Sequence, residues 1–221
     1  MSPMRLKRFY YNLFSHFYDG FVRLHSGDRR ASMRDFLARS ADLRQGYTVV
    51  DLCTGTGSSA LRMVLDGVSV IGIDLSEGML RQAQRKSGQV SGIYWIQADA
   101  KFLPIASSSV DRITCSYAMY EIAGDVRSEV LQEAIRILKP HGIFIMMEHL
   151  PPNQRFIRLL YLARIYLLGT KDVLAFAGSE ETELSRFFLR VETVVGPGAK
   201  TKAVLGYKAS PRIRSANISA V

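Results

Sequence analysis

The hydrophobic positions of this chain change their spacing in a regular way between residues 47 and 150. Short runs rich in valine and isoleucine, typical of buried strands, alternate with stretches whose apolar residues recur every three or four positions, as on one helix face. The predicted strands span 47–52, 68–73, 93–97, 110–116 and 142–148, and the predicted helices span 58–66, 77–86 and 126–138. This alternation predicts an α/β fold with a parallel sheet covered by helices on both faces.

The two ends of this region have patterns of their own. Lys139-Pro140-His141-Gly142 is a helix stop, which separates the last of these helices from the strand that follows it. Towards the C-terminus we expect a helix over 182–188 and two strands, 189–195 and 201–208, around a Gly-Pro-Gly turn. We expect one domain over 47–208 and a flexible tail over 209–221.

The N-terminal 46 residues predict a helical cap. Residues 5–22 place apolar, mostly aromatic side chains on one helix face, and a second helix is expected over 29–43. The aromatic stripe comprises Leu6, Phe9, Tyr10, Leu13, Phe14, Phe17 and Phe21. Such a face packs on the core, covers an apolar substrate as a lid, or contacts a membrane surface, and the pattern does not choose among these roles.

A second unusual segment spans 151–185, which we expect to be a helical insertion near the substrate site. Its predicted helix, 154–168, is apolar on nearly all sides and carries scattered arginines. It is too short to span a bilayer, because a transmembrane helix needs about 20 apolar residues. Burial against substrate and shallow membrane insertion both fit this composition.

Charge is distributed unevenly along the 221 residues, whose net charge is +9. Residues 1–46 carry +5 and 151–221 carry +6, whereas 47–150 carry −2. Basic flanks favour an anionic partner such as a membrane surface, although solvated surface charge explains them equally well. The start of the chain is not typical of a signal peptide, and Cys53 and Cys115 lie in apolar segments typical of reduced thiols. We therefore expect a cytoplasmic protein, peripheral on the inner face of the membrane if it binds one.

The first predicted strand leads into a glycine-rich turn, from Asp51 through Gly55 to Gly57. Gly55 allows a tight turn, and Gly57 is expected to let backbone N–H groups approach a ligand closely. The helix expected after the turn would add unpaired N–H donors and the positive end of its dipole. A strand, a glycine turn and a helix start in this order predict a nucleotide-type binding unit.

An acidic residue ends each of the first three predicted strands: Asp51, Asp74 and Asp99. Asp74 lies near the offset expected of an acid that accepts hydrogen bonds from ribose hydroxyls. Asp99 is suited to accept from an adenine amino group, with the Ala100 N–H reaching a ring nitrogen. Leu75 and Met79 would supply apolar surface for the ring faces. Three acids at one sheet edge predict an adenosine site.

These motifs together resemble the class I S-adenosylmethionine-dependent methyltransferases, over about residues 47–150. The branch they resemble most is the ubiquinone/menaquinone biosynthesis C-methyltransferase family, through the Asp51–Gly57 loop and the run Phe14–Asp19. The resemblance implies a Rossmann-like, doubly wound, seven-stranded sheet with a terminal antiparallel hairpin, and S-adenosylmethionine as cofactor without a metal. The residues that it places at the cofactor are Tyr18, Asp51, Cys53, Thr54, Gly55, Gly57, Asp74, Leu75, Met79, Asp99, Ala100, Ser116 and Tyr117.

The chain departs from that family after the fourth predicted strand. The quinone enzymes carry an aromatic-Gly-Leu-Arg-Asn run there, whereas this chain reads Tyr117-Ala118-Met119-Tyr120-Glu121. Tyr120 and Glu121 thus replace the arginine and asparagine of that run, which argues against a quinol acceptor. Methyl transfer needs a base only if the nucleophile starts protonated. The catalytic candidates at this edge are Tyr120, Glu121, Glu148 and His149, with His16 and Tyr18 on the expected lid. Glu148 and His149 are the preferred pair.

Other classes fit the sequence less well. A dinucleotide oxidoreductase would need a Tyr-x-x-x-Lys set, and an NTPase would need a phosphate-binding loop with a lysine. An amino-directed nucleic-acid methyltransferase would carry an Asn/Asp-Pro-Pro-aromatic turn. The sequence has none of these motifs. We therefore expect a methyltransferase acting on a small hydrophobic or membrane-associated acceptor, quinol-like or lipid, with nucleic acid disfavoured. The alternatives are a phospholipid N-methyltransferase, an RNA methyltransferase and a non-catalytic protein that binds S-adenosylmethionine.

Overall fold

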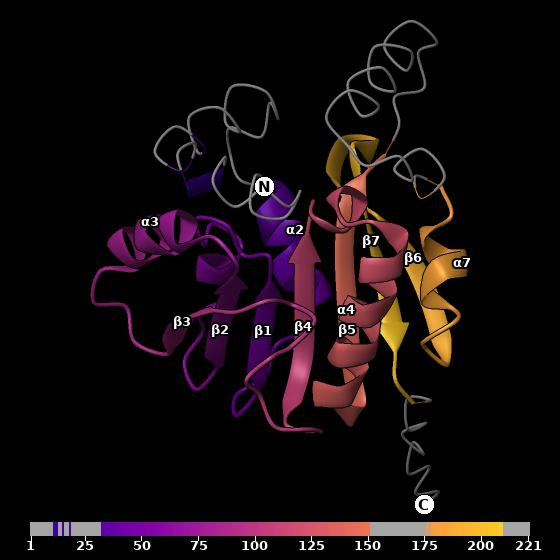
Figure 1. The fold of residues 1–221 in the computed structure, drawn as a ribbon, viewed down its shortest axis with the longest axis horizontal. Helices are drawn as coiled ribbons and strands as arrows, with labels where there is room; N and C mark the ends of the chain where they lie inside the picture. The colour runs from indigo at the N-terminus through magenta and orange to yellow at the C-terminus, as the bar shows by residue number, and fades with distance from the viewer. Residues whose placement is uncertain are drawn as a thin grey trace, which may run out of the picture.

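A computed structural model describes residues 32–150 and 178–209, together with residues 11, 12, 15, 18 and 176. Its seven strands are β1 Thr48–Leu52, β2 Ser69–Asp74, β3 Ile93–Gln97, β4 Val110–Ser116, β5 Leu138–His149, β6 Arg190–Val195 and β7 Thr201–Tyr207. They form one sheet in the order β3-β2-β1-β4-β5-β7-β6 (Figure 1). Every neighbouring pair is parallel except the two that include β7. The predicted fold, including the antiparallel end of the sheet, is confirmed.

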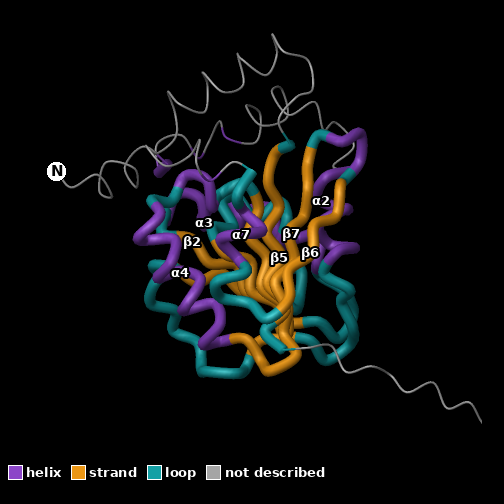
Figure 2. Tube along the Cα trace, turned by 90° about the vertical axis from the view of Figure 1, so that its right-hand side faces the viewer, coloured by secondary structure: helices purple, strands orange, loops and turns teal. Residues whose placement is uncertain are grey.

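Helices cover both faces of this sheet. The helical elements are α2 Ser32–Ser40, η1 Ala60–Met63, α3 Glu77–Ser87, η2 Met119–Glu121, α4 Gly124–Ile137, α7 Glu180–Leu184 and η3 Pro197–Ala199. Successive residues of a strand point to opposite faces, so on β5 the buried Ile145 and Met147 pack in a cluster with Leu37 of α2. Phe144 and Met146 pack on the other face in the cluster that contains α4 and α7. Figure 2 shows α2 and α4 on opposite sides of the strands.

The connection from β1 to β2 differs from the prediction. A helix is expected over 58–66, but the structure has only the short 3-10 helix η1. Ala60 and Met63 are buried against β1 and β2, and Gly67, with a φ of 72°, turns the chain soon afterwards. A longer helix would need more residues than Ala60 and Met63 to pack against the sheet. The expected contribution of a helix dipole behind the glycine turn is therefore wrong.

The helix stop after α4 is confirmed, because α4 ends at Ile137. The next strand begins immediately, at Leu138 rather than at residue 142, with a register shift between Val110 and Arg112 of the neighbouring β4. In the C-terminal part, α7 is shorter than the helix expected over 182–188 and begins at Glu180.

Several predictions fall on residues outside the described part of the chain. The helix over 154–168 and nearly all of the helix over 5–22 and of the tail over 209–221 are among them. The division into cap, domain and insertion therefore stays a prediction. Across the described residues, the structure has no helix that is long and apolar enough to cross a membrane.

Candidate functional site

The glycine turn after β1 is held at the carboxyl edge of the sheet by backbone hydrogen bonds. The Thr54 N–H donates to the carbonyl oxygen of Ile73 at 2.9 Å, and the Gly57 N–H donates to that of Thr54 at 3.0 Å. Gly55 has a φ of 56°, a conformation that residues with a side chain rarely adopt. A Cβ atom built on Gly55 meets no atom of the described residues within 4 Å. Within this part of the chain, the turn therefore has free space at Gly55, where a ligand can approach the backbone.

Gly57 has a different reason to lack a side chain. A Cβ atom built there lies 2.4 Å from the Cη2 atom of Trp95 and 3.0 Å from the Cβ of Ala83 in α3. The Trp95 Nε1–H donates to Ser87 at 3.1 Å, which fixes the indole under α3. The bare Cα of Gly57 therefore makes room for Trp95, a packing reason that the sequence analysis does not include. The expected role of Gly57 beside a ligand stays a prediction.

Asp51 lies beneath the turn and is fully buried. Its two carboxylate oxygens accept hydrogen bonds from the hydroxyls of Thr54 and Thr114, each at 2.6 Å. Burial raises the pKa of Asp51 to about 6, although these hydrogen bonds lower it. Both Asp51 and Thr54 thus support the turn from inside, rather than presenting their polar groups to a ligand as predicted.

Asp74 connects the end of β2 to the same turn. One carboxylate oxygen accepts the Gly55 N–H at 2.8 Å and the other accepts the Ser76 N–H at 2.8 Å. Ser76 in turn caps α3 by accepting the Met79 N–H at 3.2 Å. Burial raises the pKa of Asp74. Since each carboxylate oxygen can accept a second hydrogen bond, Asp74 retains the capacity to bind a ribose diol.

The residues predicted to surround an adenine are only partly suited to that role. Asp99 and Ala100 are half-buried, and Asp99 accepts the Lys101 N–H at 3.0 Å in a tight turn after β3. Leu75 is half-buried as well, but Met79 is only 2% exposed. Met79 therefore belongs to the core beneath α3, and Leu75 is the better placed of the two to cover a ring.

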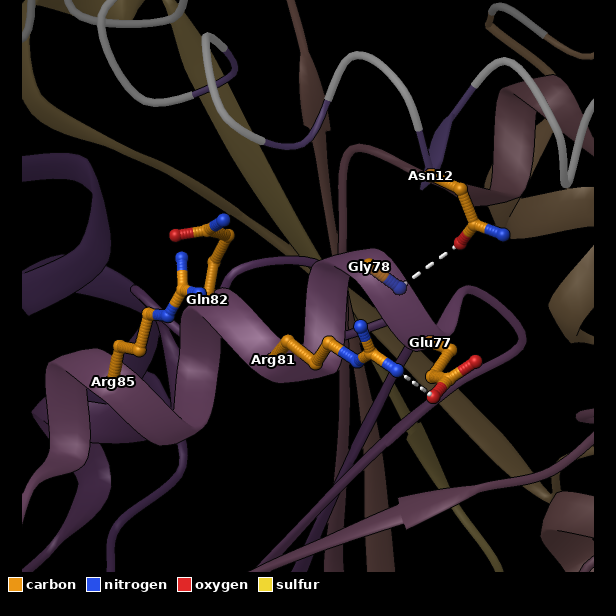
Figure 3. A pocket seen from close by; sticks show the side chains of 6 residues that line it. All are labelled: Asn12, Glu77, Gly78, Arg81, Gln82 and Arg85. Carbon is orange, nitrogen blue, oxygen red and sulfur yellow. Dashed lines mark hydrogen bonds and ion pairs between the residues drawn. The ribbon is translucent and has the colours of Figure 1, made fainter.

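A residue of the N-terminal segment joins the site from above α3. The Asn12 side-chain oxygen accepts a hydrogen bond from the Gly78 N–H at 2.9 Å (Figure 3). It also accepts one from the Ser76 hydroxyl at 2.7 Å. A pocket of about 210 Å³ lies beside this contact, with Arg81 and Arg85 of α3 in its wall. None of the predicted cofactor residues lines this pocket, so we assign it to the junction between Asn12 and α3.

Two tyrosines bind one carboxylate beyond the end of β4. The Tyr11 hydroxyl donates to one oxygen of Glu121, and the Tyr120 hydroxyl donates to the other at 3.2 Å. Burial, followed by the charge of Glu121, raises the pKa of both tyrosines, so both stay protonated at neutral pH. Tyr18 interacts electrostatically with both. The N-terminal segment thus reaches the carboxyl edge at two strands, β2 through Asn12 and β4 through Tyr11.

The predicted pair of Glu148 and His149 is separated by strand alternation. Glu148 is 3% exposed and belongs to the face of β5 that carries α7, whereas the His149 ring stacks on Tyr117 with centroids 4.2 Å apart. Tyr117 donates its hydroxyl to Thr201 at 3.1 Å. The His149 ring also lies near the Tyr120 ring, with ring centroids 6.4 Å apart. The two predicted partners therefore cannot act side by side.

The remaining predicted residues lie at the same edge. Cys53 directly follows β1, with a φ of 52°, and both cysteines are free thiols. The Ser116 hydroxyl lies 3.2 Å from that of Ser59, which links the end of β4 to the turn. Within the described residues, no group of three or more His, Cys, Asp or Glu side chains is arranged to hold a metal ion.

Sequence reasoning included Glu121 among the candidate bases but missed three other contributors to this edge. Thr114 has a weak sequence signal, since it is a polar residue between the buried Ile113 and Cys115 of β4. Asn12 and Tyr11 have no such signal, because their contacts join positions separated by 64 and 110 residues along the chain.

The sheet order, together with the glycine turn that Asp74 holds by a hydrogen bond, defines a Rossmann-like domain for an adenosine-type cofactor. A family model described as a methyltransferase domain matches residues 49–142. The chain is therefore similar to methyltransferases over these residues, which confirms the resemblance in this region. Gly55 and Asp74 fit this cofactor, since one leaves open space and the other has free acceptor capacity.

Curated relatives have similar sequences over this region. The demethylmenaquinone methyltransferase of Symbiobacterium thermophilum is 36% identical over 132 residues, which are 57% of this chain and 51% of the relative. The ubiquinone/menaquinone biosynthesis C-methyltransferase UbiE of Acidiphilium cryptum is 35% identical over 126 residues, 55% of this chain and 49% of the relative. The chain thus spans about half the length of the curated relatives it matches.

Solved structures share the fold over most of the chain. A methyltransferase dependent on S-adenosylmethionine from Aquifex aeolicus superposes with a TM-score of 0.65 at 19% identity, over 82% of this chain and 94% of that one. The protein solved in complex with the Trm112 methyltransferase activator of Haloferax volcanii superposes with a TM-score of 0.69 at 20% identity, over 90% of this chain and 97% of that one.

Proposed function

We propose that this chain transfers a methyl group from S-adenosylmethionine to a small hydrophobic acceptor, quinol-like or lipid, at the carboxyl edge of its sheet. The observation that carries the proposal is the proximity of two kinds of groups at this edge. Leu52 of β1 and Cys115 of β4 are paired in register. The open Gly55 turn and the Tyr120–Glu121 pair therefore follow neighbouring strands at the same edge.

The cofactor, when bound, supplies an electrophilic methyl group on a sulfonium. The chain's own residues need only bind and align the two molecules and exclude water, which is the main source of rate enhancement in such a transfer. Asp74 and the Gly55 backbone would hold the cofactor. The carboxylate of Glu121, bound by the Tyr11 and Tyr120 hydroxyls, is available to receive a proton from an acceptor that begins protonated.

The acceptor class has two sources of support. The curated relatives are named for quinone biosynthesis, and this supports a quinol-like acceptor. The segments on either side of residues 47–150 are basic, with net charges of +5 and +6, and this supports an acceptor presented at an anionic membrane surface. A phospholipid amine is the second candidate, because Glu121 and the tyrosines offer a carboxylate and aromatic rings, which attract ammonium groups.

The decisive experiment is transfer of tritiated methyl from S-adenosylmethionine, with three acceptor pools in parallel. The pools are a reduced quinone mixture, a total lipid extract separated by head group, and RNA. The proposal predicts label in the quinol or lipid fraction. Label in RNA alone, or in none of the pools while the cofactor binds, would reject it.

A further inference from the structure

The first turn of α3 is capped by a side chain that lies far away in the sequence. Ser76 precedes this helix and accepts the N–H of Met79. The N–H of Gly78 needs an acceptor from outside, because the first amides of a helix have none within it. The side-chain oxygen of Asn12 accepts this N–H at 2.9 Å (Figure 3). It also accepts the Ser76 hydroxyl at 2.7 Å, so Asn12 completes the cap.

Gly78 lacks a side chain where this contact needs the space. A Cβ atom built on Gly78 lies 2.8 Å from the carbonyl oxygen of Asn12 and 2.9 Å from its Cα. The Ser15 hydroxyl lies 3.1 Å from the same Cβ, donates to the Asn12 carbonyl oxygen at 2.9 Å, and is nearly fully buried. Backbone atoms cannot move aside as the end of a flexible side chain can. Glycine at position 78 is therefore what lets Asn12 and Ser15 pack directly on α3.

Tyr11 and Asn12 are adjacent in the sequence but contact two different parts of the site. Asn12 binds Ser76, whose N–H donates to Asp74 beside the cofactor turn. Tyr11 donates its hydroxyl to Glu121, which lies beyond β4 where we place the acceptor. One short piece of chain thus connects the cofactor end of the carboxyl edge to the acceptor end.

We infer that Asn12 is a positioning residue, which binds the cap of α3 and thereby holds Tyr11 on Glu121. This inference rests on the proposed function, because it assigns Asn12 to the acceptor end of the same reaction. The physical reason is chain connectivity. Neighbouring Cα atoms are about 3.8 Å apart, so a fixed Asn12 leaves the ring of Tyr11 few positions. Without that contact, the Tyr11 hydroxyl reaches Glu121 only at the entropic cost of ordering the chain around it.

The test compares Gly78→Ala, Asn12→Ala and Asn12→Asp in the full chain, with Gln84→Ala at an exposed position of α3 as control. Alanine favours a helix more than glycine does, so Gly78→Ala strengthens α3 itself and removes only the space that Asn12 occupies. Asn12→Asp keeps an oxygen for both donors, and its negative charge suits a helix N-terminus. This set of variants separates the docking of Asn12 from the stability of the helix.

Hydrogen exchange at the Asn12 and Ser15 amides measures this docking without turnover. We expect exchange at least about tenfold faster than in wild type for Gly78→Ala and Asn12→Ala. Asn12→Asp and the control should keep wild-type protection. Wild-type protection in either Gly78→Ala or Asn12→Ala would overturn the inference.

Turnover gives a second, independent readout. Gly78→Ala and Asn12→Ala should each lose about tenfold in kcat and keep their affinity for S-adenosylhomocysteine within about threefold, because the bond from Gly55 to Asp74 remains. Asn12→Asp should keep its kcat within about threefold. A Gly78→Ala variant as active as the control, or an Asn12→Asp variant as slow as Asn12→Ala, would contradict the positioning role.

The two proposals fail in different ways. A wild-type chain that binds cofactor but methylates no pool rejects the proposed function, and the acceptor role of Asn12 with it. An active wild type with an equally active Asn12→Ala variant rejects the inference alone.

Discussion

The Oδ2 atom of Asp74 accepts the N–H of Gly55 at 2.8 Å, so the end of β2 fixes the turn that follows β1. The other oxygen of Asp74 accepts the Ser76 N–H at the start of α3. One carboxylate therefore sets the relative position of the two segments that would surround a bound cofactor.

Replacing Asp74 with asparagine should weaken cofactor binding. An amide side chain offers one acceptor where the structure uses two, so either the Gly55 or the Ser76 N–H loses its partner. The loss of one such bond, about 1–3 kcal/mol, predicts an affinity for S-adenosylhomocysteine at least about tenfold lower by calorimetry. Asp66→Asn, at an exposed position before β2, is the matched control. Equal affinities in both variants would contradict this role of Asp74.

Gly57→Ala should destabilise the fold more than Gly55→Ala. Both residues have positive φ, so both variants share a backbone strain of about 1–2 kcal/mol. Only the alanine at 57 also collides with the ring of Trp95, which adds about 1–3 kcal/mol. Denaturant unfolding of the two variants measures the difference. We expect Trp95→Leu to remove part of the extra loss at 57, and equal losses at both glycines would be incompatible with this packing.

Asp51 should make stability depend on pH. Its folded pKa of about 6 lies above the unfolded value, so its favourable contribution is complete below about pH 4 and disappears as pH rises through 6. The shift of about two units corresponds to about 3 kcal/mol. The free energy of unfolding of the wild type, relative to Asp51→Asn, should therefore fall by about that amount from pH 4 to 7. A constant difference would mean that Asp51 is charged in the fold at all these values.

His149→Ala should lower turnover with little change in cofactor affinity. The ring lies against Tyr117 and near Tyr120, on the side where we place the acceptor. We expect kcat to fall by about tenfold or more, as for the loss of a group that aligns or deprotonates the acceptor. His141→Ala, at an exposed position, controls for nonspecific effects. Unchanged kcat in the His149 variant would remove this residue from the mechanism.

The basic flanks predict binding to anionic membranes. Flotation with liposomes that contain anionic lipid should carry the chain at low salt and release it at high salt, because electrostatic attraction is screened within about 10 Å at 0.1 M salt. Neutral liposomes are the control. No flotation at low salt would reject membrane association.

The sequence predicts the sheet well because its signals are local. Alternating apolar runs locate the strands to within a few residues, and the acids at the ends of β1, β2 and β3 mark the edge where ligands bind. The helix after the glycine turn is predicted wrongly, because apolar spacing over 58–66 does not reveal how few of those positions the sheet can bury.

The site itself is predicted less completely, because its contacts cross the chain. Tyr11 and Glu121 are distant in sequence, and only the folded chain brings them together. The role of Gly57 depends on the size of one partner, Trp95, from another strand. Glu148 looks from its position like a base at the open edge, but its strand face directs the carboxyl group into the interior.

The central claim, that the turn at Gly55 and the carboxylate of Asp74 form the S-adenosylmethionine site, is tested most directly by calorimetry of the full chain. S-adenosylmethionine, S-adenosylhomocysteine and NADH are titrated separately into wild type and Asp74→Asn. The account predicts saturable binding of the first two ligands, weakened by Asp74→Asn, and no binding of NADH. Binding of NADH in preference to S-adenosylmethionine, or affinity for S-adenosylmethionine that is indifferent to Asp74, would contradict it.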